Sequence, residues 1–308
     1  MHIDRLWRLA FGLGLIATPE DLGSQSQEPV HLALLDTLTR DFVESGWDSR
    51  AMLRRFVLSA TYRQSSRATE ASLDLDPEGA LFSRAAKTRR SAEVVRDAAL
   101  FAAGLLHEER GGPSVFPYQP PGLWQEKRGI VYPVGHGQDL VRRSLYTFWR
   151  RTSPPPTLAM FGAPSRDVCT VQRGSTSTPL QTLAVWNDPQ FVAVATGLGR
   201  AAAEAAPDDI GARVDYLFRT LLTRDPLAGE RNAMAELLDE QREVFRGAPA
   251  DAFAFANFSL EDAAHPKAAV DAAAPTPGSP EALTCIEVAA TAVVASTLLG
   301  FEDVTRRR

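Results

Sequence analysis

Arginine and aromatic side chains that could take part in chemistry are concentrated between Arg142 and Val192, around the triple proline Pro154 to Pro156. Guanidinium groups bind carboxylate or sulfate groups through paired hydrogen bonds, and aromatic rings stack on sugars and peptides. This composition indicates a surface for a carboxylated ligand or a sulfated glycan. With two aromatic residues of the preceding loop, the candidate ligand-binding residues are Arg142, Arg143, Tyr146, Trp149, Arg150, Arg151, Arg173, Tyr118 and Trp124.

The same side chains also have a structural interpretation, which we favour. The arginines would pair with Asp139, Asp167 and Asp188 and fix the segment to neighbouring helices, and the aromatic rings would anchor the loop. Adjacent residues of a helix point to different sides, so Arg96 and Asp97 are not expected to pair with each other. One of these two can instead reach inward to a buried partner.

The sequence contains no recognisable catalytic constellation. Cys169 is a candidate nucleophile or metal ligand, but either role needs a partner side chain. The histidines His2, His31, His107, His136 and His265 show no ligand spacing with Cys169 or with one another. Phosphate-loop, zinc and nucleophile-elbow signatures are also missing. We therefore expect free buried thiols at Cys169 and Cys285, no metal site, no bound haem and a non-catalytic function.

Amphipathic helices must position these residues, and most of them can be predicted from apolar spacing and capping residues. The predicted helices start at residues 3, 31, 48, 91, 178, 189, 208 or 209, 225 and 281. The inward face of the helix that follows Asp225 is expected at Ala233, Leu237, Gln241 and Val244.

The central segment, residues 113–177, is irregular and rich in proline, arginine and aromatic residues. Arginine and apolar residues alternate from Arg142 to Arg151, which predicts a short extended run, and Pro154 to Pro156 favour polyproline geometry over α-helix. Thr178-Pro179-Leu180-Gln181 has the pattern of a capping box with proline at the first helical position. A polar, acidic loop is expected over residues 65–77.

These elements predict a mainly α protein: an irregular helical bundle with a long loop segment rich in proline, arginine and aromatic residues and at most a short β ribbon. Three regions are expected. Residues 1–246 form the helical domain, residues 247–280 an alanine- and proline-rich variable linker, and residues 281–308 a closing helix that packs back on the domain.

Composition restricts the function further. The chain has 308 residues, 44% of them hydrophobic, and a net charge of -5, which gives no support to nucleic-acid binding. The N-terminus lacks the pattern of a signal peptide, and the apolar run 288–299 is shorter than the roughly 20 residues that span a bilayer. We therefore expect no transmembrane segment.

Several motifs occur in an order that resembles a known family. From the N-terminus onward they are FVESGWD (Phe42 to Asp48), LSATYRQSS (Leu58 to Ser66), YQPPGLW (Tyr118 to Trp124), RRSLYTFW (Arg142 to Trp149), DVCTV (Asp167 to Val171), TPLQ (Thr178 to Gln181) and LAVWNDPQFV (Leu183 to Val192). From Trp7 to about Phe245 the chain resembles domain-of-unknown-function family 1553, the PSD-one domain.

The resemblance implies a planctomycete protein that is exported to the periplasm or cell surface and associated with cytochrome-c-like modules. This chain resembles the domain alone, truncated at its N-terminus, and any haem would belong to a partner or to upstream domains. Three functions are open: a non-catalytic binding or assembly module, a protein or enzyme that acts on polysaccharide or sulfated glycan through the arginine and aromatic segment, and an accessory that docks a cytochrome of another chain.

Overall fold

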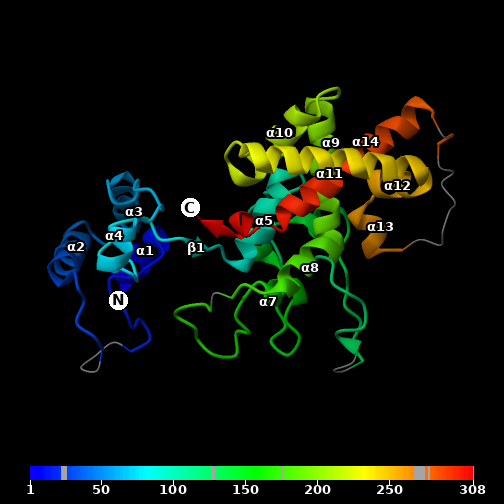
Figure 1. Ribbon diagram of the computed structural model, residues 1–308. Coiled ribbons are helices and arrows are strands. Elements are labelled where there is room, and N and C mark those ends of the chain that lie inside the picture. The colour runs from blue at the N-terminus through cyan, green and yellow to red at the C-terminus, as the bar shows by residue number, and fades with distance from the viewer. Residues whose placement is uncertain (22–25, 126–128, 175, 267–274, 277, 308) are drawn as a thin grey trace. The chain divides into compact units, whose positions relative to one another are not determined.

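The computed structural model describes residues 1–21, 26–125, 129–174, 176–266, 275–276 and 278–307, and this part of the chain is mainly α-helical (Figure 1). Two short strands, β1 (Thr88–Arg89) and β2 (Arg306–Arg307), pair antiparallel. The predicted fold class, mainly α with at most a short β ribbon, is confirmed. The chain divides into two compact units: unit 1 holds residues 1–89, 169–174 and 306–308, and unit 2 holds residues 90–168 and 175–305.

Unit 1 is built from helices whose starts follow local capping chemistry. Its helices are α1 (His2–Phe11), α2 (Leu32–Glu44), α3 (Ser49–Leu58) and α4 (Glu70–Leu75). Asp48 Oδ1 accepts hydrogen bonds from the backbone amides of Arg50 (3.0 Å) and Ala51 (2.9 Å), as the sequence predicts. Trp7, Phe42 and Phe56 are buried in its core.

Helix α4 lies where the sequence predicts a loop. Its first turn is closed by two reciprocal contacts: Thr69 N donates to Ser72 Oγ (3.0 Å), and Ser72 N donates to Thr69 Oγ1 (3.2 Å). None of the residues of α4 is buried. A buried apolar stripe therefore does not predict this helix, and its capping contacts define its start.

Unit 2 is organised around helix α14, which packs on α9, α11 and α12 (Pro249–Ala256). Its main helices are α5 (Ala92–Ala102), α8 (Pro179–Asn187), α9 (Pro189–Ala205), α10 (Ile210–Leu222), α11 (Ala228–Gly247) and α14 (Pro280–Leu299). Gly199 lets α9 approach α14 closely, because a Cβ atom there would lie 2.7 Å from Ala292 N and from Val288 O. The predicted break between α8 and α9 is present, and Asp188 Oδ1 accepts from Gln190 N (2.9 Å).

Helix α14 has the length and composition of a membrane span over its 20 residues, and it is the one such helix in the described ranges. Residues 288–299 alone are shorter than a membrane span, as the sequence predicts, but the whole helix is long enough. In unit 2, 67% of its apolar window is buried by protein. That burial is also what a core helix of a folded domain shows.

Two helices occupy part of the expected linker 247–280. They are α12 (Pro249–Ala256) and α13 (Leu260–Ala264), and Ala252, Ala256 and Leu260 on them are buried. Alanine is common in linkers, but its small side chain also allows a close helix contact, and Ala252 packs with Ile286 and Ala289 of α14. Residues 267–274 and 277 lie outside the described part. The predicted region boundaries stay a prediction.

The buried face of α11 differs from the predicted one. Leu238 is fully buried, Leu237 is half-buried and Val244 is exposed. The predicted face at Ala233, Leu237, Gln241 and Val244 is therefore wrong by about one residue. Apolar residues occur on more than one side of this helix, and its contacts with α10 and α14 decide which side is buried.

The irregular segment contains the 3-10 turns η1 (Gly137–Val141) and η2 (Ser144–Tyr146) and the helix α7 (Pro156–Met160). Turn η2 lies inside the stretch from Arg142 to Arg151, so the extended run expected there is interrupted. Extended pairing is restricted to isolated bridges, His107 with Arg142 and Val115 with Thr147. The expectation that the triple proline excludes helix is also wrong, because Pro156 occupies the first position of α7, where no amide hydrogen is needed.

Candidate functional site

A buried arginine, Arg96 of α5, holds the start of the arginine and aromatic segment in place. Its Nε donates to Gln190 Oε1 (2.7 Å), Nη2 to Leu140 O (2.7 Å), and Nη1 to Arg142 O (2.9 Å). Burial lowers the pKa of the Arg96 guanidinium, and the nearby Asp97 carboxylate opposes that shift. Arginine nevertheless stays charged at neutral pH. One buried side chain therefore joins α5, α9 and this segment.

The expectation that Arg96 and Asp97 do not pair is wrong. Arg96 Nη1 lies 3.8 Å from Asp97 Oδ1, which is within the distance of an ion pair. Asp97 Oδ1 also accepts from Ser144 N at 2.8 Å. The inward partner that the sequence allowed for one of these two residues is confirmed for Arg96.

Arg142 and Arg150, two of the predicted ligand-binding residues, make internal contacts. Arg142 is buried, donates to the carbonyl oxygens of Pro113 (3.1 Å) and Gly111, and lies over the Tyr146 ring at 4.1 Å. Arg150 lies over the ring of buried Trp124 at 4.7 Å. The contacts are internal, as the structural interpretation expects, but the partners of Arg142 and Arg150 in them are carbonyl oxygens and aromatic rings instead of the expected Asp139, Asp167 and Asp188.

The other predicted ligand-binding residues are distributed over several places. Trp149 Nε1 donates to Ser165 O (3.1 Å), and the Tyr118 carbonyl accepts from Gln190 Nε2 (3.3 Å). Arg143 lies 3.9 Å from Asp97 Oδ2, and Arg151 is exposed. Arg173 belongs to unit 1, whereas the other eight belong to unit 2. Their role in ligand binding stays a prediction.

Unit 2 also contains a cavity of about 550 Å³ that is lined by none of these nine residues. Helices α9, α12 and α14 contribute most of its wall, and that volume lies in the usual range for small-molecule sites. Among its lining residues are Arg200, Ala203, Ala256, Leu283, Cys285 and Val288.

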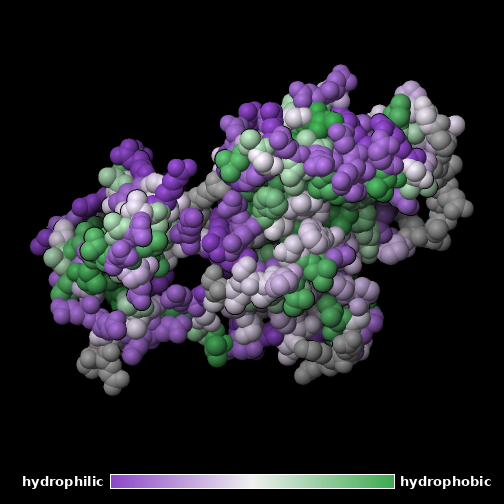
Figure 2. Space-filling model, in the orientation of Figure 1, coloured by the Kyte–Doolittle hydropathy of each residue, from purple (hydrophilic) through white to green (hydrophobic). Residues whose placement is uncertain are grey.

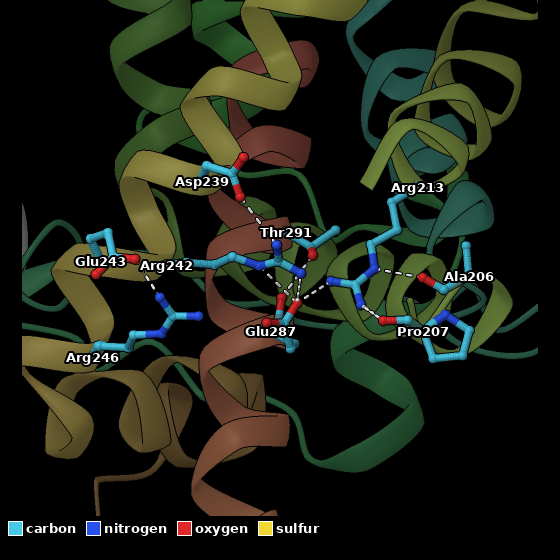
Figure 3. Close-up of polar contacts among 9 residues, drawn as sticks. All are labelled: Ala206, Pro207, Arg213, Asp239, Arg242, Glu243, Arg246, Glu287 and Thr291. Atoms are coloured by element: carbon cyan, nitrogen blue, oxygen red, sulfur yellow. Dashed lines mark hydrogen bonds and ion pairs between the residues drawn. The ribbon is translucent and has the colours of Figure 1, made fainter. Parts of the chain in front are cut away.

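Glu287 is another residue that lines the cavity, and it is bound by two arginines from different helices (Figure 3). Arg242 Nε of α11 donates to Glu287 Oε2 at 3.0 Å, and Arg213 Nη1 of α10 donates to the same oxygen. Burial raises the pKa of Glu287, but the hydrogen bonds from Arg242 and Arg213 outweigh this and lower it overall. Glu287 is therefore ionised, and its carboxylate already accepts hydrogen bonds from two arginines. A carboxylate held in this way is unsuited to proton transfer.

The two cysteines have opposite surroundings. Cys285 in the cavity wall is buried, as predicted, and burial raises the pKa of its thiol. A protonated thiol is a poor nucleophile. Cys169 is exposed, so the expectation of a buried thiol is wrong there. The short stretch 169–174 that carries it is almost wholly exposed and has no helix or strand of its own.

Helix α8 exposes apolar side chains and buries a polar one. Leu180, Leu183 and Trp186 are 61%, 53% and 52% exposed, and we call them the α8 apolar face. Figure 2 shows hydrophobic residues gathered over α8. Gln181 is buried instead, because its Nε2 donates to Met160 O (2.9 Å) and its Oε1 accepts from Thr178 N (3.5 Å). This second contact forms one half of the predicted capping box.

The sequence signal for the α8 apolar face is a Leu-x-x-Leu-x-x-Trp spacing around a glutamine that caps the helix. This spacing indicates an apolar face but not its direction. The contact between Gln181 and α7 decides it, because the side of α8 that meets α7 is the side of Gln181.

The described residues form a mainly α-helical protein with a cavity in unit 2 and an arginine-rich irregular segment. Residues 1–238 match the model of the family PSD1, protein of unknown function (DUF1553), and the chain belongs to this family. The resemblance of its motifs is thereby confirmed. No curated protein and no solved structure matches the chain.

Proposed function

We propose that this protein is a non-catalytic module for binding and assembly, and that the α8 apolar face is its contact surface. The observation that carries the proposal is the outward orientation of Leu180, Leu183 and Trp186. Burying one such side chain contributes about 1.5–3 kcal/mol, and tryptophan is enriched among the residues that dominate binding energy. A partner that covers this face therefore gains much of its affinity from it.

The polar groups of the cavity support a non-catalytic function. Glu287 is engaged by two arginines, and the Cys285 thiol has a raised pKa. Arg200 Nη2 donates to Ala256 O at 2.9 Å. These groups make structural contacts and do not form an acid–base pair or an activated nucleophile.

For the partner we propose a cytochrome-c-like module supplied by another chain or another part of an exported planctomycete protein. The support is the family resemblance together with an apolar face of the kind that docking requires. Haem chemistry would then belong to the partner, while this chain would supply position and affinity.

The test is a calorimetric titration of the full chain with a purified cytochrome-c-like domain. We expect saturable binding that Leu183→Asp weakens about tenfold or more, because it places a charge in the buried centre of the contact. The matched control is Leu145→Asp, which changes an exposed leucine of η2 that is 75% exposed and lies outside α8. Absence of binding, or equal weakening by both variants, would contradict the proposal.

A second candidate function, binding of a small amphipathic ligand, is favoured by the cavity. The cavity is lined by the apolar residues Ala203, Leu283 and Val288 and also by the charged residues Arg200 and Glu281. Fluorescence titration with anilinonaphthalene sulfonate tests it. Leu283→Ser should weaken binding of the dye, whereas Leu227→Ser, at an exposed leucine outside the cavity, should leave it unchanged. Equal dye binding by both variants contradicts this function.

A further inference from the structure

Two histidines and a glutamate that are far apart in the sequence meet in unit 2. His136 precedes η1, and Glu261 and His265 belong to α13 and its C-terminal end. One potential ligand atom from each lies within 4.8 Å of the others. His136 Nδ1 and Glu261 Oε1 are 2.8 Å apart across 125 residues of sequence. Such a separation explains why no ligand spacing is visible in the chain.

We propose that His136, Glu261 and His265 bind a divalent transition-metal ion, with Zn²⁺ as the best-matched ion. Two imidazole nitrogens and one carboxylate oxygen are a common ligand set for zinc, with water in the remaining position. The His136 and Glu261 side chains are 72% and 38% exposed, so an ion can reach the cluster from solvent. This site is separate from the cavity and from the α8 apolar face.

Backbone groups orient two of the three ligands. His265 Nε2 contacts Gly135 O at 2.8 Å, and since a carbonyl oxygen only accepts, Nε2 carries the proton and Nδ1 keeps its lone pair in the neutral ring. Gly137 N donates to Glu261 Oε2 at 2.7 Å. Contacts of this kind fix the tautomer of a ligating histidine and the orientation of a ligating carboxylate.

The cluster can hold an ion once one of its rings has turned. Zinc with bonds of about 2.0–2.2 Å in tetrahedral geometry holds its ligand atoms roughly 3.3–3.6 Å apart. The ion would take the place of the proton between His136 Nδ1 and Glu261 Oε1, and the proton of neutral His136 would move to Nε2. The rings of His136 and His265 stack at 3.7 Å with 12° between their planes, so one ring must turn to direct its lone pair at the ion.

Charge favours a cation at this place. The cluster contains the carboxylate of Glu261, whose Oε2 accepts the Gly137 amide hydrogen while Oε1 faces His136 Nδ1. Neutral imidazole and ionised carboxylate are the forms that bind metal.

The test is a calorimetric titration of the EDTA-treated full chain with Zn²⁺, and a parallel titration with Co²⁺ followed by visible absorption. We expect one ion per chain and the strong absorption bands of four-coordinate Co²⁺. His136→Ala, Glu261→Gln and His265→Ala should each weaken the affinity about 10- to 100-fold. Melting of each variant in EDTA shows whether it is folded. Should His265→Ala not fold, His265→Gln keeps a donor for Gly135 O and removes the ring nitrogen.

His31→Ala, His107→Ala and Cys169→Ser serve as matched controls, because they remove potential ligands outside the cluster. Their affinity should be unchanged. The proposal is overturned if the chain shows no saturable binding, or if a folded His136 or His265 variant binds Zn²⁺ as tightly as the original chain. In that case the cluster only ties α13 to η1 through hydrogen bonds.

Discussion

Arg96 Nε donates a 2.7 Å hydrogen bond to Gln190 Oε1, and this contact joins α5 to α9 across 94 residues of sequence. Both side chains are buried, at 3% and 4% exposure. The remaining Arg96 donors bond the carbonyl oxygens of Leu140 and Arg142 and the Ser144 hydroxyl, so this guanidinium helps to fix the position of the irregular segment.

Replacing Arg96 by lysine should destabilise unit 2. A lysine ammonium cannot reproduce the planar donor geometry, and acceptors such as Leu140 O would be left buried without a partner. We expect a loss of about 3 kcal/mol in the free energy of unfolding, measured by urea denaturation. The control, Arg151→Lys, changes an exposed arginine and should shift the midpoint little. Similar midpoints for both variants would show that the Arg96 contacts contribute little.

Alanine substitutions at two helical glycines should act in opposite directions. At Gly199 a Cβ atom would collide with Ala292 N and Val288 O at 2.7 Å, so Gly199→Ala must separate α9 from α14. The expected cost is about 1–3 kcal/mol. Gly229 in α11 has no atom within 4 Å of its Cβ position, so Gly229→Ala should stabilise by about 0.5–1 kcal/mol. Thermal melting of both variants measures the difference, and a stabilised Gly199→Ala would contradict the packing argument.

Glu287 should make stability depend on pH in the acidic range. Its pKa in the folded protein is lowered, so its contribution is present above the unfolded value of about 4.3 and is lost as pH falls through the folded value. Urea denaturation from neutral pH to below pH 4 measures this. Glu287→Gln should be less stable at neutral pH and should flatten the profile, whereas Glu236→Gln, at an exposed position of α11, should retain it. An unchanged profile in Glu287→Gln would assign the pH dependence to other groups.

The two thiols should react at very different rates with a disulfide reagent. Cys169 is exposed, whereas Cys285 is buried and the pKa of its thiol is raised by burial. We expect one rapid equivalent in the native protein and the second only in denaturant. Cys169→Ser should abolish the rapid phase and Cys285→Ser should preserve it. Rapid reaction of Cys285 in native protein would mean that the cavity wall opens readily.

Local sequence chemistry explains why so much of the helical framework could be predicted. Asp48, Asp209 and Asp188 each accept a hydrogen bond from an amide two or three residues later, so each cap depends only on neighbouring residues. Helix α4 was missed because its capping pair, Thr69 and Ser72, lacks a buried face beside it. The sequence predicts that the aromatic and arginine segment is irregular, but the placing of its turns η1 and η2 depends on contacts with Arg96, which lies far away in the chain.

By itself the sequence determined the mainly α class, the family and most helix starts, because capping, apolar spacing and ordered motifs are properties of nearby residues. Only the tertiary structure decided that Gln181 faces inward while Leu183 and Trp186 face outward, and that His136 lies beside Glu261 and His265. These relationships follow from the packing of elements distant in sequence. A helix with apolar residues on several sides could bury any one of these sides. The elements that pack against the helix determine which side is buried.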